Sequence, residues 1–156
     1  MTAQVADRLI FADKEIPLFT NPLSPYLKQM DIQFVSNSTA NWRGYVATWE
    51  MIKSEGAERL YLVKLRANRT RSELIGLADL FPGFDKVFAH WFSGELRCPQ
   101  GERLNYVHGG YSSTYEYDLM MELKRGVLVH KYAKHNLSPE RSPSNIPLDF
   151  LKGNDD

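Results

Sequence analysis

The sequence contains a single cysteine, Cys98, among its 156 residues. An internal disulfide is therefore excluded, although small secreted domains usually carry paired cysteines. Residues 1–7 include acidic and polar side chains and no apolar core, so they do not read as a signal peptide. No apolar run approaches the ~20 residues that cross a bilayer as a helix. We therefore expect a cytoplasmic protein without a membrane partner, whose first seven residues form a loose tail.

An excess of basic charge is also missing. Nineteen Lys and Arg residues balance nineteen Asp and Glu residues. Proteins that bind nucleic acid usually show a clear basic excess, so we expect no nucleic-acid partner. The chain does have 43% hydrophobic and 12% aromatic residues, which is typical of a globular domain with a buried core. We predict one domain over residues 1–132 and a flexible or docking tail over residues 133–156.

Alternation of apolar and polar residues, which is typical of strands, is clearest in two pairs of segments. A short turn joins the members of each pair, so each pair predicts an antiparallel hairpin. The first hairpin joins residues 42–51 to residues 60–65, and the second joins residues 115–123 to residues 127–132.

Prolines and apolar residues at helical spacing predict the remaining elements. Pro17 cannot donate a ladder hydrogen bond, so the short strand around it belongs at a sheet edge. Pro99 is expected to end another short strand over residues 94–98. Apolar residues at helical spacing predict a helix from about Ser72 to Phe81 and a further helical turn over residues 86–92. The elements together predict an α+β fold: a mostly antiparallel curved sheet or partly open β-barrel with one or two helices packed on it.

No phosphate loop, dinucleotide fingerprint, nucleophile elbow or zinc motif occurs in the sequence. The strongest candidate for a ligand loop begins at His108, because its glycines allow close approach and its hydroxyls could hold a phosphate, a sugar or a base. An ordinary loop between strands is the alternative. The candidate ligand residues of this loop are His108, Gly109, Gly110, Tyr111, Ser112 and Ser113.

Carboxylates follow this loop along a predicted strand. Glu116 and Asp118 are two residues apart and therefore share a face. With His108 and Tyr111, they are the candidates for acid–base chemistry or for holding a magnesium ion with a nucleotide. A solvated sheet face is the alternative.

Three arginines, Arg66, Arg69 and Arg71, lie where the first hairpin leads into the predicted helix. A phosphate bound there would also meet the helix N-terminus. An acidic partner protein and an ordinary charged surface are the alternatives.

Metal ligands are few. His90, Cys98 and His108 have no compact ligand spacing, and a structural zinc site would need a fourth ligand. We expect neither a metal nor another cofactor.

Trp42 and Arg43 open a strand beside a polar run, where an aromatic anchor and a cation could contact a partner protein. Trp42–Tyr45 and Trp91–Leu96 resemble signature stretches of small bacterial proteins, a resemblance that implies no particular function.

Two functions follow from these observations. The first is a non-catalytic binding protein that occupies another protein's surface, as toxin-neutralising immunity proteins do. The alternative is an enzyme or sensor for a phosphorylated small molecule or nucleotide, acting through the loop at His108. The sequence leaves open whether any reaction is catalysed.

Overall fold

The computed structural model describes residues 4–36, 38–105 and 114–136, and within them it contains nine strands and two short helices. The elements are β1 (Asp7–Phe11), β2 (Lys14–Leu18), α1 (Ser24–Gln29), β3 (Tyr45–Ser54), β4 (Ala57–Asn68), β5 (Leu74–Gly76), α2 (Leu77–Leu80), β6 (Val87–Phe88), β7 (Gly94–Asn105), β8 (Thr114–Lys124) and β9 (Val127–His135).

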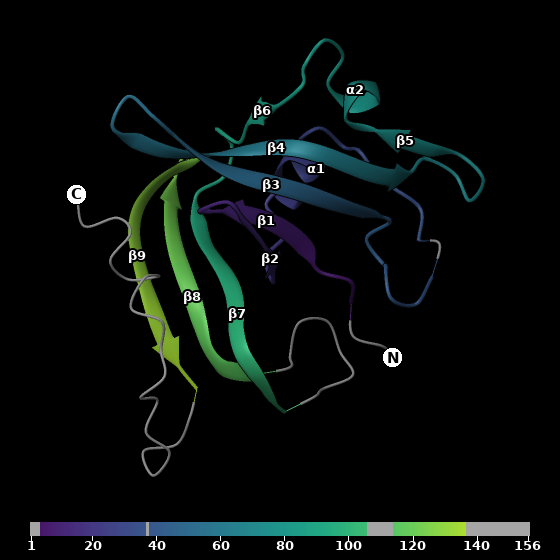
Figure 1. Cartoon of the computed structure of the whole chain (residues 1–156). Coiled ribbons are helices and arrows are strands. Elements are labelled where there is room, and N and C mark those ends of the chain that lie inside the picture. The colour runs from purple at the N-terminus through teal and green to yellow at the C-terminus, as the bar shows by residue number, and fades with distance from the viewer. Residues whose placement is uncertain (1–3, 37, 106–113, 137–156) are drawn as a thin grey trace.

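The strands form one sheet in the order β2-β1-β3-β4-β9-β8-β7, with β5 and β6 added to β4 (Figure 1). Most pairs are antiparallel, but β1 and β3 run parallel. The α+β class is confirmed, whereas the expectation of an antiparallel sheet is only partly right because the sheet is mixed. The path is open, although the Phe19 N–H donates to the Arg97 carbonyl at 2.7 Å and so links the chain after β2 to β7.

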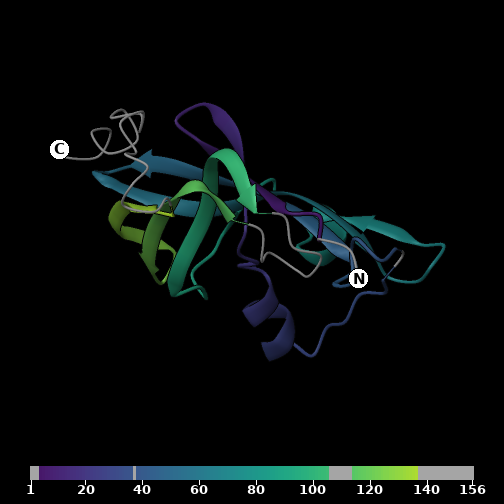
Figure 2. The same cartoon turned by 90° about the horizontal axis from the view of Figure 1, so that it is seen from below.

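The sheet bends where β4 meets β9. These strands share only the pair Arg59 and Val127, next to a hydrogen bond of 2.9 Å from the Leu60 N–H to the Gly126 carbonyl. Figure 1 shows β7, β8 and β9 running across the direction of β3 and β4. The view from below in Figure 2 shows α1 on one side of the sheet. The bend lets both parts of the sheet contribute to one apolar cluster, which includes Trp49, Leu62 and Met121.

Both predicted hairpins are confirmed. β3 pairs with β4 and β8 pairs with β9, each antiparallel through a short turn. The inward positions of β3 alternate as expected, since Tyr45, Ala47, Trp49 and Met51 are buried. Strand alternation therefore located the core face of β3 correctly.

The helix predicted from Ser72 to Phe81 is wrong for most of its length. Leu74–Gly76 forms β5 and pairs with the end of β4, which buries Ile75, and only Leu77–Leu80 is helical. The expected helical turn over residues 86–92 is likewise replaced by β6, which pairs with β4. In both places the open edge of β4 supplies backbone partners that the local sequence pattern does not reveal.

The two prolines in strands lie at the two ends of the sheet path. Pro17 is in β2, as its edge position predicts. Pro99 does not end its strand, because β7 continues from Gly94 to Asn105. β7 has β8 as its only ladder partner among the described strands, and an edge strand tolerates a missing N–H.

The described chain ends just after β9, which extends to His135, and residues 137–156 of the predicted tail lie outside the described residues. Neither described helix is long and apolar enough to cross a membrane.

Candidate functional site

Trp42 is the most prominent exposed aromatic residue near a cleft. Its exposed fraction is 48%, whereas that of Trp49 is 0%. Trp42 lines a surface cleft of about 520 Å³ together with Ser36, Ser38, Thr39 and Arg71. These side chains offer an aromatic face, three hydroxyls and one guanidinium to an occupant.

A second cleft, of about 390 Å³, is also lined by Trp42. Its lining includes Lys28, Phe34, Arg43 and Tyr45. Trp42 is therefore a lining residue of both clefts.

Backbone and amide hydrogen bonds hold the Trp42 loop against the start of the chain. The Gln4 side chain donates to the Thr39 carbonyl at 2.8 Å and accepts from the Trp42 N–H at 2.7 Å. The Val5 N–H donates to the Ala40 carbonyl at 2.7 Å. We call the hydrogen bonds between residues 4–7 and residues 39–43, which include the ion pair of Asp7 with Arg43, the amino-terminal clamp.

The clamp is anchored by a buried carboxylate at the first position of β1. Asp7 is fully buried, and its Oδ1 accepts from Arg43 Nη2 at 2.7 Å and from the Ala47 N–H at 3.0 Å. Its Oδ2 accepts from Trp49 Nε1 at 3.1 Å, while Arg43 Nη1 donates to the Val5 carbonyl at 2.7 Å. Burial raises the pKa of Asp7, and the Arg43 charge and the three donors oppose this effect.

Gly44 lets the chain turn from the loop into β3. Its φ of +76° is in the left-handed region, and an added Cβ would lie 2.7 Å from the Val35 carbonyl oxygen. The Gly44 carbonyl accepts from the Asn68 N–H at 2.9 Å, and the Asn68 carbonyl accepts from the Val35 N–H at 2.8 Å. A glycine is thus needed where the loop, residues 34–35 and the end of β4 meet.

The three arginines predicted to bind phosphate do not converge on one point. Arg71 lines the Trp42 cleft. Arg69 forms an exposed ion pair with Glu73 at 3.1 Å, and Arg66 is exposed on β4. The helix expected to complete a phosphate site begins only at Leu77. The structure instead brings Arg71 together with Trp42, two residues that the sequence had placed in separate hypotheses.

The proposed carboxylates have different surroundings. Asp118 is buried, forms an ion pair with Arg97 at 3.2 Å and accepts a hydrogen bond from Asn136 Nδ2 at 3.2 Å. Glu116 is partly buried on the same strand. Neither is among the described residues that line the Trp42 cleft.

The predicted ligand loop, with His108, Gly109, Gly110, Tyr111, Ser112 and Ser113, lies outside the described residues. Within the described ranges, no three His, Cys, Asp or Glu side chains lie close enough together to hold a metal ion. Cys98 is buried in the apolar cluster, where burial and then the nearby Asp118 charge raise its pKa. Cys98 therefore behaves as a core residue.

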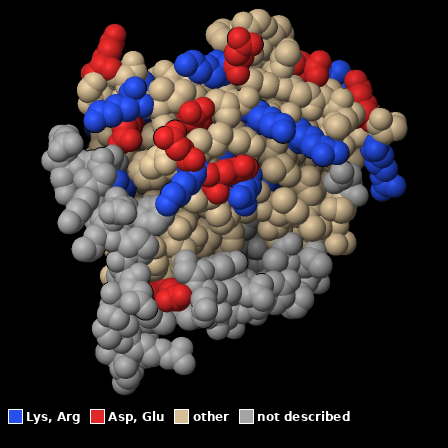
Figure 3. All heavy atoms as spheres, viewed as in Figure 1, with Lys and Arg blue, Asp and Glu red and all other residues tan. Residues whose placement is uncertain are grey.

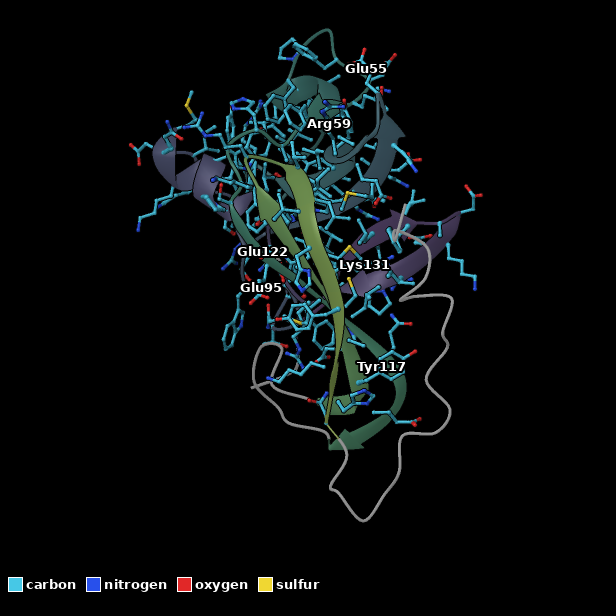
Figure 4. All side chains as sticks on the ribbon, turned by 90° about the vertical axis from the view of Figure 1, so that its left-hand side faces the viewer. Glu55, Arg59, Glu95, Tyr117, Glu122 and Lys131 are labelled. Atoms are coloured by element: carbon cyan, nitrogen blue, oxygen red, sulfur yellow. The ribbon has the colours of Figure 1, made fainter. Side chains whose placement is uncertain are left out.

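A further set of polar side chains lies on strands β7–β9. Figure 4 shows Glu95 and Glu122 on one side of these strands and Lys131 on the other. Tyr132 donates to Glu95 Oε2 at 2.5 Å, and this hydrogen bond raises the pKa of Tyr132. Glu95 and Glu122 are exposed cross-strand neighbours, and neither lines the two clefts at Trp42.

The sequence missed the residues that hold the site in place. Residues 4–7 are not a loose tail, because they carry the clamp and begin β1. In the sequence, Asp7 is recognisable only as a carboxylate next to an apolar run. The residues that donate hydrogen bonds to it lie about forty positions later in the chain.

The described residues lining the two clefts at Trp42 differ in their titratable groups, since the second cleft includes Lys28, Asp31 and Tyr45. Among the described residues that line the larger cleft there is no His, Cys, Asp, Glu, Lys or Tyr, and a guanidinium does not lose its proton in proteins. No family model matches the chain, and no curated protein or solved structure shows significant similarity to it.

Proposed function

We propose that the chain is a non-catalytic binding protein that contacts another protein through the surface around Trp42. The observation that carries this proposal is a half-exposed tryptophan that lines two clefts. Tryptophan and arginine are enriched among the residues that dominate protein–protein binding energy. Arg71 supplies the second of these residue types beside Trp42.

Pre-organisation strengthens the proposal. A loop that must be ordered on binding loses affinity, whereas a loop already fixed does not. The Trp42 N–H is bound to Gln4, and the next residue is tied to the buried Asp7. A protein that neutralises another protein by covering its surface needs such a rigid anchor and no catalytic group. A toxin-neutralising role is one form that this proposed function could take.

The test is site-specific photo-crosslinking in cells of the source organism. A photoreactive residue placed at Thr39, which is exposed and lines the cleft, leaves Trp42 intact. The control carries the same group at Val129, whose exposed fraction of 54% resembles that of Trp42. We expect a discrete adduct from position 39, no such adduct from position 129, and loss of the adduct when Trp42→Ala is added.

An adduct from position 39 that persists in Trp42→Ala would place the binding energy elsewhere and contradict the proposal. Circular dichroism and the unfolding midpoint check that each variant remains folded. Because about half of Trp42 is buried, its removal should lower the free energy of unfolding by about 1–3 kcal/mol and leave the protein folded.

A further inference from the structure

The outer face of β1, β3 and β4 is divided by charge. Strand register places Arg8, Thr48 and Lys64 in one row across the three strands. Arg66 lies in the next row, toward the Trp42 loop, opposite Val46. Lys64 and Arg66 are both exposed, so this half of the face is basic.

The next row on the same face carries two carboxylates, although Lys86 lies over Tyr61 in this row and Arg59 follows in the row beyond. Glu15, Ile10, Glu50 and Tyr61 occupy one row across β2, β1, β3 and β4. Figure 3 shows a band of Lys and Arg side chains to the right of the centre, with some Asp and Glu side chains above it, and a mixture of both signs nearer the centre of the view. The charge boundary runs between adjacent rows, and the exposed ion pair of Arg8 with Glu15 bridges it at 3.3 Å.

The basic half continues into the Trp42 site. Beyond Arg66, β4 ends at Asn68 and the connection to β5 carries Arg71, which lines the cleft beside Trp42. Leu74, the first residue of β5, has an exposed fraction of 53%. Figure 1 shows the β4–β5 connection and the chain before β3 at the same end of the molecule. Cationic side chains and the exposed side chains of Trp42 and Leu74 therefore lie at the same end of the molecule.

The small extent of this basic surface favours a short acidic protein segment over a long polyanion as its occupant. The row with Glu15 and Glu50 lies directly beside the basic rows, so carboxylates interrupt the basic surface along the sheet, which disfavours an extended polyanion. The chain also has no net charge, whereas nucleic-acid surfaces are usually strongly basic. A protein segment a few residues long can place its carboxylates within the basic half alone.

We infer that the partner presents an acidic protein segment to this face. Its carboxylates lie over Lys64, Arg66 and Arg71, and an apolar side chain of the same segment packs on Trp42. Charge complementarity of this kind increases the association rate and selects among partners. The inference rests on the proposed function, since it specifies the chemistry of the occupant of the Trp42 surface.

The test selects random peptides displayed on phage against the full chain, with Trp42→Ala as the counter-selection target. We expect the enriched peptides to combine Asp or Glu residues with an aromatic or branched apolar residue. Binding of a synthetic enriched peptide should weaken by about tenfold or more in Arg66→Glu with Arg71→Glu, and it should weaken as salt is raised. Glu50→Lys, which reverses a charge in the row with Glu15, is the matched control and should not weaken binding.

Other outcomes distinguish a failure of this inference from a failure of the proposed function. Enriched peptides that need Trp42 but carry no excess of acidic residues, or that bind the double charge reversal normally, would overturn the inference and leave the proposed function standing. An oligonucleotide that competes with the peptide at equal charge would also overturn it, because recognition would then rest on negative charge alone. Failure to enrich any Trp42-dependent peptide would count against both.

Discussion

Asp7 and Arg43 are 36 residues apart in the chain, and their side chains meet at 2.7 Å in the interior beneath the Trp42 loop. The carboxylate is fully buried, and the guanidinium is largely so. The ion pair ties the start of β1 to the residue that follows Trp42. The rigidity of the proposed binding surface depends on this contact.

Replacing an acceptor oxygen of Asp7, whose described partners are all donors, should strongly destabilise the fold. Asp7→Asn leaves Arg43 buried without a counter-charge and turns an amide N–H₂ toward Trp49 Nε1, which is itself a donor. Breaking a buried ion pair by removing one partner costs about 3–5 kcal/mol. Denaturant unfolding measures the change. Glu15→Gln, which breaks the exposed Arg8 pair, is the control and should change stability by less than about 1 kcal/mol; equal effects of the two substitutions would mean that the buried pair contributes no more than an exposed one.

Gly44 and Gly56 give a matched pair of backbone tests. Both have positive φ, +76° and +79°, so alanine at either position costs about 1–2 kcal/mol in backbone strain. A Cβ at Gly44 would also meet the Val35 carbonyl oxygen at 2.7 Å, whereas a Cβ at Gly56 has nothing within 4 Å. Gly44→Ala should therefore lower the free energy of unfolding more than Gly56→Ala, as measured by denaturant unfolding. Equal losses would show that the close approach to Val35 relaxes without penalty.

These features also mark how far the sequence could predict the structure. Alternation along residues 42–51 identified β3 and its buried face, because strand period is a local property. The β5 pairing and the amino-terminal clamp could not be predicted, since each depends on partners supplied by a distant part of the chain. Trp42 is predicted to be a partner-binding residue from its polar neighbours and this stays a prediction, whereas its proximity to Arg71 required the fold.

Ionisation of Cys98 in the unfolded state should lower the free energy of unfolding as pH rises above 9.0. Burial raises its pKa above the ordinary value of 9.0, so the folded state keeps the proton that the unfolded state releases. This contribution is fully present below pH 9.0 and is lost as pH rises above it, by at most about 1.4 kcal/mol per pH unit. The difference in unfolding free energy between wild type and Cys98→Ala, followed across this range, isolates the thiol. A pH-independent difference would contradict a raised pKa.

Phosphorylated small molecules should leave the melting temperature unchanged. A ligand at about 100 times its Kd would add about 2.7 kcal/mol and raise Tm by about 5–10 °C in a chain of this size. A thermal shift panel of nucleotides and sugar phosphates, each with and without magnesium, provides the measurement. A clear rise with one ligand class would favour the alternative function through the loop at His108.

The most direct test of the account is the affinity of the partner identified by crosslinking for wild type, Trp42→Ala and Val129→Ala, measured by titration calorimetry. The account predicts that Trp42→Ala weakens binding by about 30-fold or more, the loss typical of a dominant anchor, and that Val129→Ala leaves Kd unchanged. An unchanged Kd for Trp42→Ala would contradict the account, because binding would then not depend on the tryptophan that the amino-terminal clamp holds in place.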